Sequence, residues 1–92
     1  MTAALVEMYT TSWCPYCTRA KRLLERKGAG YEEISIEEHP ERRAEMIQRS
    51  GRRTVPQIFI DGHHIGGSDE LAALDEAGGL ERLLSPARAT AQ

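Results

Sequence analysis

The sequence predicts a single α/β domain in which one four-stranded mixed sheet is flanked by helices. Short apolar stretches typical of strands alternate with amphipathic stretches typical of helices, in the order β-α-β-α-β-β-α with a short helix at the end. The early strand–helix–strand unit indicates parallel pairing, and a later tight two-strand turn indicates antiparallel pairing. The length of 92 residues suits one domain.

The N-terminal half begins with a strand, a helix and a second strand. Residues 5–9 form the first strand, and Pro15 suits the first turn of the helix because its missing N–H costs nothing there. The helix runs to about residue 27, and residues 31–36 form the second strand. An apolar stripe at helical spacing predicts the buried face of this helix, which comprises Cys17, Ala20, Leu23 and Leu24.

A second helix begins near Pro40 and ends at Gly51. Its first turn carries Glu41, whose charge favours the positive end of the helix dipole. The helical spacing of its apolar residues predicts a buried side formed by Ala44, Met46 and Ile47.

A hairpin and two further helical segments complete the domain. Residues 57–60 form a strand, and Asp61-Gly62 predicts a two-residue turn because both central positions of the favoured turn need positive φ. Residues 63–65 return as a strand. Ser68 is the expected N-cap of a third helix, and residues 80–84 form a last helical turn or two.

The composition is that of an ordinary globular protein, with 40% hydrophobic residues, 28% charged residues and a formal net charge of −2. This charge gives no indication of nucleic acid or a membrane as partner, and the apolar runs are far too short to span a bilayer. The N-terminus lacks the basic region and apolar core of a signal peptide. We therefore expect a cytoplasmic monomer with one domain over residues 1–85 and a frayed tail over residues 86–92.

The reactive chemistry concentrates at Cys14 and Cys17, the only cysteines of the chain. A disulfide between them closes too short a loop to add much stability, and a C-x-x-C beside a strand–helix–strand unit predicts a thioredoxin-like redox motif. Cys14 is expected to begin the helix, where free N–H groups and the dipole stabilise a thiolate and lower its pKa. Cys14 is therefore the expected nucleophile, and Cys17, on the buried stripe, the expected resolving thiol.

A zinc site is the competing interpretation of two cysteines at this spacing. A tetrahedral zinc site needs about four ligands, and the remaining candidates are His39, His63 and His64. Adjacent His63 and His64 on a strand would point to opposite faces. We therefore expect no metal, and we interpret both histidines as part of a solvated hairpin.

A row of basic residues shares one face of the first helix and comprises Arg19, Arg22 and Arg26. We interpret this row as a solvated helix face, with docking of an acidic partner as the alternative.

Three motifs resemble those of the glutaredoxins, specifically the small bacterial dithiol class. They are Cys14-Pro15-Tyr16-Cys17, Thr54-Val55-Pro56 and Gly66-Gly67-Ser68-Asp69, in this order along the chain. The resemblance covers about residues 6–84 and is almost residue for residue over residues 49–61. It implies a thioredoxin fold and a glutathione-dependent thiol–disulfide oxidoreductase with glutathione as co-substrate. The implied partners are glutathione and proteins that are glutathionylated or contain disulfides.

The resemblance also implies a glutathione groove. Tyr16 forms one wall, and a cis Pro56 brings the Val55 backbone beside Cys14, where it pairs with the substrate peptide like an added strand. Ser68 and Asp69 receive the γ-glutamyl end of glutathione at a helix N-terminus. The full set of implied glutathione-binding residues is Tyr16, Thr54, Val55, Pro56, Ser68, Asp69, Arg52 and Thr11.

Thr11 is the main departure from the family pattern, which usually has lysine at this position. A lysine would bind the substrate carboxylate and stabilise the thiolate, whereas Thr11 offers only a hydroxyl. We expect Arg52 or Arg53 to substitute in part for this charge, and Cys14 to be less acidic than in relatives that carry the lysine.

Two other functions share these features. Some glutaredoxins hold a [2Fe–2S] cluster between two subunits, with one protein thiolate and one glutathione from each. Pro15 argues against this carrier function, because relatives that hold clusters usually have Gly or Ser there. A thioredoxin reduced by a flavoenzyme is the third interpretation, and the Pro-Tyr pair between the cysteines favours glutathione instead.

Overall fold

The computed structural model describes residues 4–84, and the tail expected at residues 86–92 lies outside this range. The predicted order of elements is confirmed. The elements are β1 (Val6–Thr10), α1 (Pro15–Arg26), β2 (Glu32–Ser35), α2 (Glu41–Ser50), β3 (Gln57–Ile60), β4 (His63–Gly66), α3 (Ser68–Glu76) and α4 (Gly79–Leu84). Among residues 4–84, no helix has both the length and the apolar character needed to cross a membrane.

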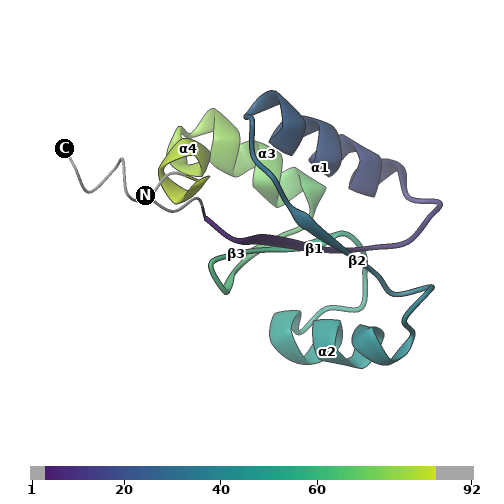
Figure 1. Ribbon diagram of the computed structural model, residues 1–92. Coiled ribbons are helices and arrows are strands. Elements are labelled where there is room, and N and C mark those ends of the chain that lie inside the picture. The colour runs from purple at the N-terminus through teal and green to yellow at the C-terminus, as the bar shows by residue number, and fades with distance from the viewer. Residues whose placement is uncertain (1–3, 85–92) are drawn as a thin grey trace.

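The four strands form one mixed sheet in the order β2-β1-β3-β4. Strand β1 pairs in parallel with β2 and antiparallel with β3, and β3 pairs antiparallel with β4. Helices α1, α3 and α4 lie on one side of the sheet and α2 lies on the other (Figure 1). The sheet is therefore covered on both faces, as the apolar character of its central strands requires.

The central strands place apolar side chains on both faces, because successive side chains of a strand point in opposite directions. Val6 and Met8 of β1 belong to the main core, which packs against α1 and α3. Tyr9 belongs to a second, smaller core. The buried members of that second core are Tyr9, Ile34, Ile36, Met46 and Phe59.

The apolar stripe predicted for α1 is confirmed. Its buried residues are Cys17, Ala20, Leu23 and Leu24. Because Leu23, Leu24 and Ala20 enter the main core, the helix has a defined rotation about its axis. That rotation turns Cys17 inward one turn from the helix start.

The prediction for the buried side of α2 is wrong at one position. Met46 is fully buried and Ile47 packs against the second core, but Ala44 is exposed. The side of α2 that faces the sheet is centred on Met46 and includes Arg42 and Glu45, which are partly buried. Ala44 lies about 200° from Met46 around the helix and therefore points to solvent.

The tight turn between β3 and β4 is confirmed at Asp61 and Gly62, whose φ angles are 51° and 82°. The Asp61 carboxylate accepts a hydrogen bond from the Leu5 N–H at 2.9 Å, and the Asp61 N–H donates to the Leu5 carbonyl at 2.8 Å. The hairpin is thereby tied to the residue that precedes β1.

Polar contacts that the sequence did not reveal attach α2 to the sheet. The Arg49 guanidinium donates to the Tyr9 hydroxyl at 2.9 Å and to the Glu7 carboxylate at 3.0 Å. It also stacks over the Phe59 ring, 4.0 Å from the centroid. The Tyr9 hydroxyl donates in turn to Glu45. Since α2 buries few apolar side chains, these contacts supply much of its attachment.

We expect Arg49→Ala to lower the free energy of unfolding by about 2 kcal/mol, because it removes a cation–π contact and two hydrogen bonds to partly buried partners. In a domain of this size that loss corresponds to a decrease in Tm of roughly 10 °C. Thermal and urea unfolding measure both values. Arg43→Ala is the matched control, because Arg43 is an exposed residue of the same helix. Equal stability of the two variants would contradict the assigned role of Arg49.

Candidate functional site

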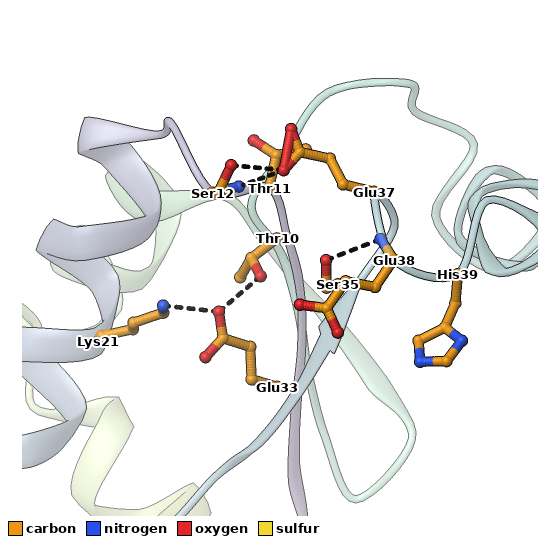
Figure 2. A pocket seen from close by; sticks show the side chains of 9 residues that line it. All are labelled: Thr10, Thr11, Ser12, Lys21, Glu33, Ser35, Glu37, Glu38 and His39. Carbon is orange, nitrogen blue, oxygen red and sulfur yellow. Dashed lines mark hydrogen bonds and ion pairs between the residues drawn. The ribbon is translucent and has the colours of Figure 1, made fainter.

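The loop between β1 and α1 is held in place from β2 and the turn that follows it. The Glu37 carboxylate accepts from the Ser12 N–H at 2.9 Å and from the Ser12 hydroxyl at 2.5 Å, and these bonds lower the pKa of Glu37. Thr11 and Ser12 line a polar cavity of about 360 Å³ beside this loop (Figure 2). The candidate Thr11 therefore borders a cavity formed mostly by polar side chains.

The Glu33 carboxylate forms a second anchor beneath the same loop. It accepts from the Thr10 hydroxyl at 2.7 Å and pairs with the Lys21 ammonium at 2.6 Å (Figure 2). The hydrogen bond from Lys21 holds the pKa of Glu33 below its ordinary value. These contacts join β1, β2 and α1 at the end of the sheet where the two cysteines lie.

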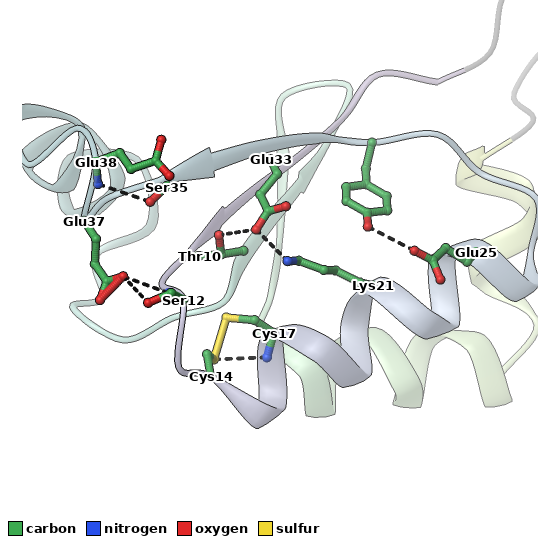
Figure 3. A network of polar contacts seen from close by, with 11 residues as sticks. Thr10, Ser12, Cys14, Cys17, Lys21, Glu25, Glu33, Ser35, Glu37 and Glu38 are labelled. Carbon is green, nitrogen blue, oxygen red and sulfur yellow. Dashed lines mark hydrogen bonds and ion pairs between the residues drawn. A yellow bond between two sulfur atoms is a disulfide. The ribbon is translucent and has the colours of Figure 1, made fainter.

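Cys14 is the N-cap of α1, with extended backbone at φ −143° and ψ 98°. Its Sγ accepts a hydrogen bond from the Cys17 N–H at 3.0 Å, and the Cα atoms of the two residues are 5.1 Å apart (Figure 3). The two sulfurs are joined in a disulfide. The first turn of the helix has no acidic residue. The N–H groups and the dipole of α1 therefore act on Sγ without an opposing carboxylate.

The two cysteines differ in exposure as predicted. Cys17 is 1% exposed, whereas Cys14 is only partly buried. The side chains around Cys14 are open to solvent: Trp13 is 93% exposed and Tyr16 54% exposed. A disulfide substrate can therefore reach the sulfur of Cys14 and not that of Cys17.

The loop before β3 runs beside Cys14. The Val55–Pro56 peptide bond is cis, as the family resemblance implied, and the Val55 carbonyl oxygen lies 3.8 Å from the Cys14 Sγ. The backbone of Val55 therefore borders the reactive sulfur. Pro56 itself is buried, whereas Thr54 is exposed.

Gln57 supports this loop, and sequence reasoning missed it. Its side chain is 1% exposed and donates to the Thr54 carbonyl at 3.0 Å and to the Thr54 hydroxyl at 3.2 Å. The side-chain oxygen Oε1 of Gln57 accepts from Nε2 of His64 at 2.7 Å. His64 also packs on Phe59, with ring centroids 5.0 Å apart. His64 is exposed, as the interpretation of a solvated hairpin predicted, and its side chain also contributes to the support of the loop through these two contacts.

The start of α3 forms the next wall, and the prediction for its cap is wrong. Gly67 is the N-cap and Ser68 is the first helical residue, because the Glu70 carboxylate accepts from the Gly67 N–H at 2.6 Å. Ser68 is 4% exposed, and its hydroxyl has no hydrogen-bond partner within residues 4–84. A Cβ atom at residue 67 would lie 3.3 Å from the Pro56 carbonyl oxygen, so glycine allows α3 to approach the cis-proline loop closely.

Two pairs of charged side chains connect the walls. The Arg52 guanidinium pairs with Glu70 at 3.2 Å, which joins the cis-proline loop to α3. Arg19 lies 3.9 Å from the Asp69 carboxylate and stacks over the Tyr16 ring at 5.4 Å from its centroid, which joins α1 to α3. Glu70 had not been identified from the sequence, since only the tertiary structure brings it to Arg52.

Contacts therefore link three separate segments that carry predicted site residues: Val55 lies beside Cys14, Gly67 at the start of α3 lies beside Pro56, and Arg19 joins Tyr16 to Asp69. Arg52 lies at the far end of this group, against Glu70. Within residues 4–84, no group of three or more His, Cys, Asp and Glu side chains is arranged to hold a metal ion.

Comparison with known proteins identifies the same family over most of the chain. The glutaredoxin family model matches residues 6–65. Glutaredoxin 3 of Escherichia coli K12 is 59% identical over 81 residues, which are 88% of this chain and 98% of that protein. Glutaredoxin from Brucella melitensis is 54% identical in its solution structure, with a TM-score of 0.80 and 91% of each chain covered.

A second similar structure is described as a buckwheat glutaredoxin–glutathione complex. It is 32% identical, has a TM-score of 0.83, and covers 90% of this chain and 78% of that one. These neighbours have the thioredoxin fold, so the predicted fold class and the resemblance to glutaredoxins are both confirmed.

We expect stability to fall in mild acid because of His64. Burial, and secondarily the charge of Arg52, hold the pKa of His64 below its ordinary value of 6.5. The unfolded chain therefore takes up a proton at a higher pH than the folded chain does, so stability declines as the pH falls from the ordinary value toward the lowered one. Urea midpoints between about pH 7.5 and about pH 5 measure this decline. His64→Gln should flatten it, and His63→Gln, at the adjacent position of the same hairpin, should not; an equal decline in all three proteins would contradict the assignment.

Proposed function

Because the chain belongs to the glutaredoxin family, we propose that it is a glutathione-dependent thiol–disulfide oxidoreductase that reduces protein–glutathione mixed disulfides and protein disulfides. The observation that carries the proposal is the position of Cys14, whose Sγ accepts the Cys17 N–H at the start of α1 beside the Val55 carbonyl. Cys17 lies buried behind it. This arrangement supports thiol–disulfide exchange with one exposed attacking sulfur and one recessed sulfur.

In the reduction of a mixed disulfide, the Cys14 thiolate attacks the glutathione sulfur. The new bond joins Cys14 to glutathione, and the protein sulfur leaves as a thiolate that takes a proton from water. The thiolate of a second glutathione then attacks the glutathione sulfur on Cys14. The products are oxidised glutathione and the free Cys14 thiolate, so the sulfur of the second glutathione is oxidised from thiol to disulfide while the protein sulfur is reduced from disulfide to thiol.

In the reduction of a protein disulfide, both cysteines take part. The Cys14 thiolate attacks one substrate sulfur and forms a mixed disulfide, and the other substrate sulfur leaves. Cys17 loses its proton and attacks Sγ of Cys14, which releases the second substrate sulfur and forms the Cys14–Cys17 disulfide. The Cα separation of 5.1 Å is within the range that such a bond requires.

The start of α3 supports the proposed seat for the γ-glutamyl end of glutathione. The helix begins with Gly67 and Ser68, and the Ser68 hydroxyl is buried without a partner within residues 4–84. A carboxylate there would accept from this hydroxyl and from free N–H groups of the first turn. Asp69 is exposed beside it and would accept from the ammonium group. The buckwheat relative described as a glutathione complex supports the same ligand class.

For the glycyl carboxylate of glutathione, we propose Arg52 as a contributor at the other end of the groove. Glu70 already offsets part of its charge at 3.2 Å. We therefore expect Arg52 to attract the carboxylate less strongly than an unpaired arginine would. We further propose that the protein acts as a monomer in the cytoplasm, where glutathione keeps thiols reduced.

Substitution of each cysteine tests the proposed roles. We expect Cys14→Ser to abolish all activity in a glutathione-coupled assay, because no other exposed thiol is present. Cys17→Ser should retain reduction of a glutathionylated peptide, which needs only Cys14, and should lose reduction of a peptide with an intramolecular disulfide. Loss of both activities in Cys17→Ser would contradict the one-cysteine route for mixed disulfides.

A second experiment tests the role of Thr11. Introduced in a Cys17→Ser background, Thr11→Lys should move the absorbance titration of the Cys14 thiolate to lower pH by about half a unit to one unit, because a nearby ammonium favours the anion. Thr11→Met adds a chain of similar bulk without charge and is the control. An unmoved titration in Thr11→Lys would show that this position does not influence the thiolate.

A further inference from the structure

Helix α1 has basic side chains that fall into two groups. Lys21 pairs with Glu33 at 2.6 Å, and the C-cap residue Lys27 pairs with Asp75 at 2.6 Å. The charges of these lysines are therefore satisfied within the fold. The arginine group consists of Arg19, Arg22 and Arg26, and we call its outward surface the α1 arginine face.

The α1 arginine face has positive charge that the fold does not neutralise. Arg22 and Arg26 are exposed, and neither has an ion pair within residues 4–84. Arg19 has one ion pair within residues 4–84, with Asp69 at 3.9 Å, and its guanidinium also stacks over the Tyr16 ring. The three side chains fall within an arc of about 60° at 100° per residue. Since the whole chain has a net charge of −2, the positive face is a local feature.

The acidic residue of the same helix does not cancel this charge. Glu25 accepts from the Tyr31 hydroxyl at 3.2 Å and so turns toward the segment before β2 (Figure 3). The first turn of α1 has no acidic residue. Three exposed arginines therefore follow one another along α1, and the acidic residue of the same helix is engaged elsewhere.

The α1 arginine face begins five residues after the reactive cysteine on the same helix. Cys14 is the N-cap of α1, and the neighbouring rings of Trp13 and Tyr16 are 93% and 54% exposed. With a rise of 1.5 Å per residue, the arginines lie about 8 to 18 Å from Cys14 along the helix axis. An extended polypeptide covers this distance with about two to six residues.

We propose that the α1 arginine face is a docking surface for acidic polypeptide, and that it selects substrates with Asp or Glu about two to six residues from the reactive cysteine. The inference rests on the proposed function, because it assumes that Cys14 attacks a protein disulfide. Complementary charge near the sulfur raises the rate of productive encounter, and salt weakens the effect.

The test uses three glutathionylated peptides of equal length, each with one cysteine. The three peptides carry acidic, neutral or basic side chains at positions two to six residues from the cysteine. Each peptide is made in two versions, one with these side chains before the cysteine and one with them after it. At low ionic strength we expect kcat/KM for the acidic peptide to exceed that for the neutral peptide about tenfold in at least one of the two directions, as about two to three weak ion pairs would give. At about 0.3 M salt the ratio should fall to about two.

A double charge reversal provides the decisive comparison. Arg22→Glu/Arg26→Glu should reverse the order, so that the basic peptide becomes the better substrate. The matched control is Arg43→Glu, an exposed position on α2, which lies on the opposite side of the sheet (Figure 1). This control should retain the preference for the acidic peptide. All proteins should reduce the mixed disulfide of cysteine and glutathione at rates within about twofold of one another, since this small substrate does not reach the α1 arginine face.

The two proposals fail in different ways. Equal kcat/KM on the three peptides would overturn the proposed docking surface, and so would a preference for the acidic peptide that persists in Arg22→Glu/Arg26→Glu. Neither result would contradict the proposed reaction. Absence of activity on the small mixed disulfide in the unaltered protein overturns the proposed function itself.

Discussion

The hydrogen bond from the Cys17 N–H to the Cys14 sulfur is the contact on which the site depends. It makes the nucleophile the cap of its own helix, so the group that must carry negative charge also satisfies an unpaired N–H of the first turn. Any movement of Cys14 away from this position would expose that N–H and withdraw the sulfur from the helix dipole. The stability of α1 and the reactivity of Cys14 are therefore linked through one atom.

The remaining walls of the groove are positioned relative to that atom by contacts between distant segments. Ser12 is held by Glu37, which fixes the loop that leads to Cys14. Thr54 is held by Gln57, which fixes the loop that carries Val55. On the third side, Gly67 allows α3 to approach Pro56 closely. Each of these segments thus has its own support, and the glutathione groove that we propose lies between them.

Features that depend on local chemistry were predictable from the sequence. The spacing of Cys17, Leu23 and Leu24 predicted the inward side of α1, and Asp61-Gly62 predicted a turn that only positive φ angles allow. Features that depend on contacts between distant segments were not predictable from the sequence. Ser68 is a good N-cap by residue type, yet the cap is Gly67, because the Glu70 carboxylate accepts from the Gly67 N–H and a Cβ atom at residue 67 would make a tight contact with the Pro56 carbonyl oxygen.

The two faces of the sheet hold their helices by different contacts, and this difference explains where the site lies. On the side of α1 and α3, a core of aliphatic side chains holds two helices whose N-termini converge near Cys14 and Ser68. On the other side, α2 is attached largely through Arg49 and Glu45, and it contributes no residue to the proposed groove. An anionic thiolate and a carboxylate substrate both require free N–H groups. The face that brings two helix N-termini together is therefore the one suited to this chemistry.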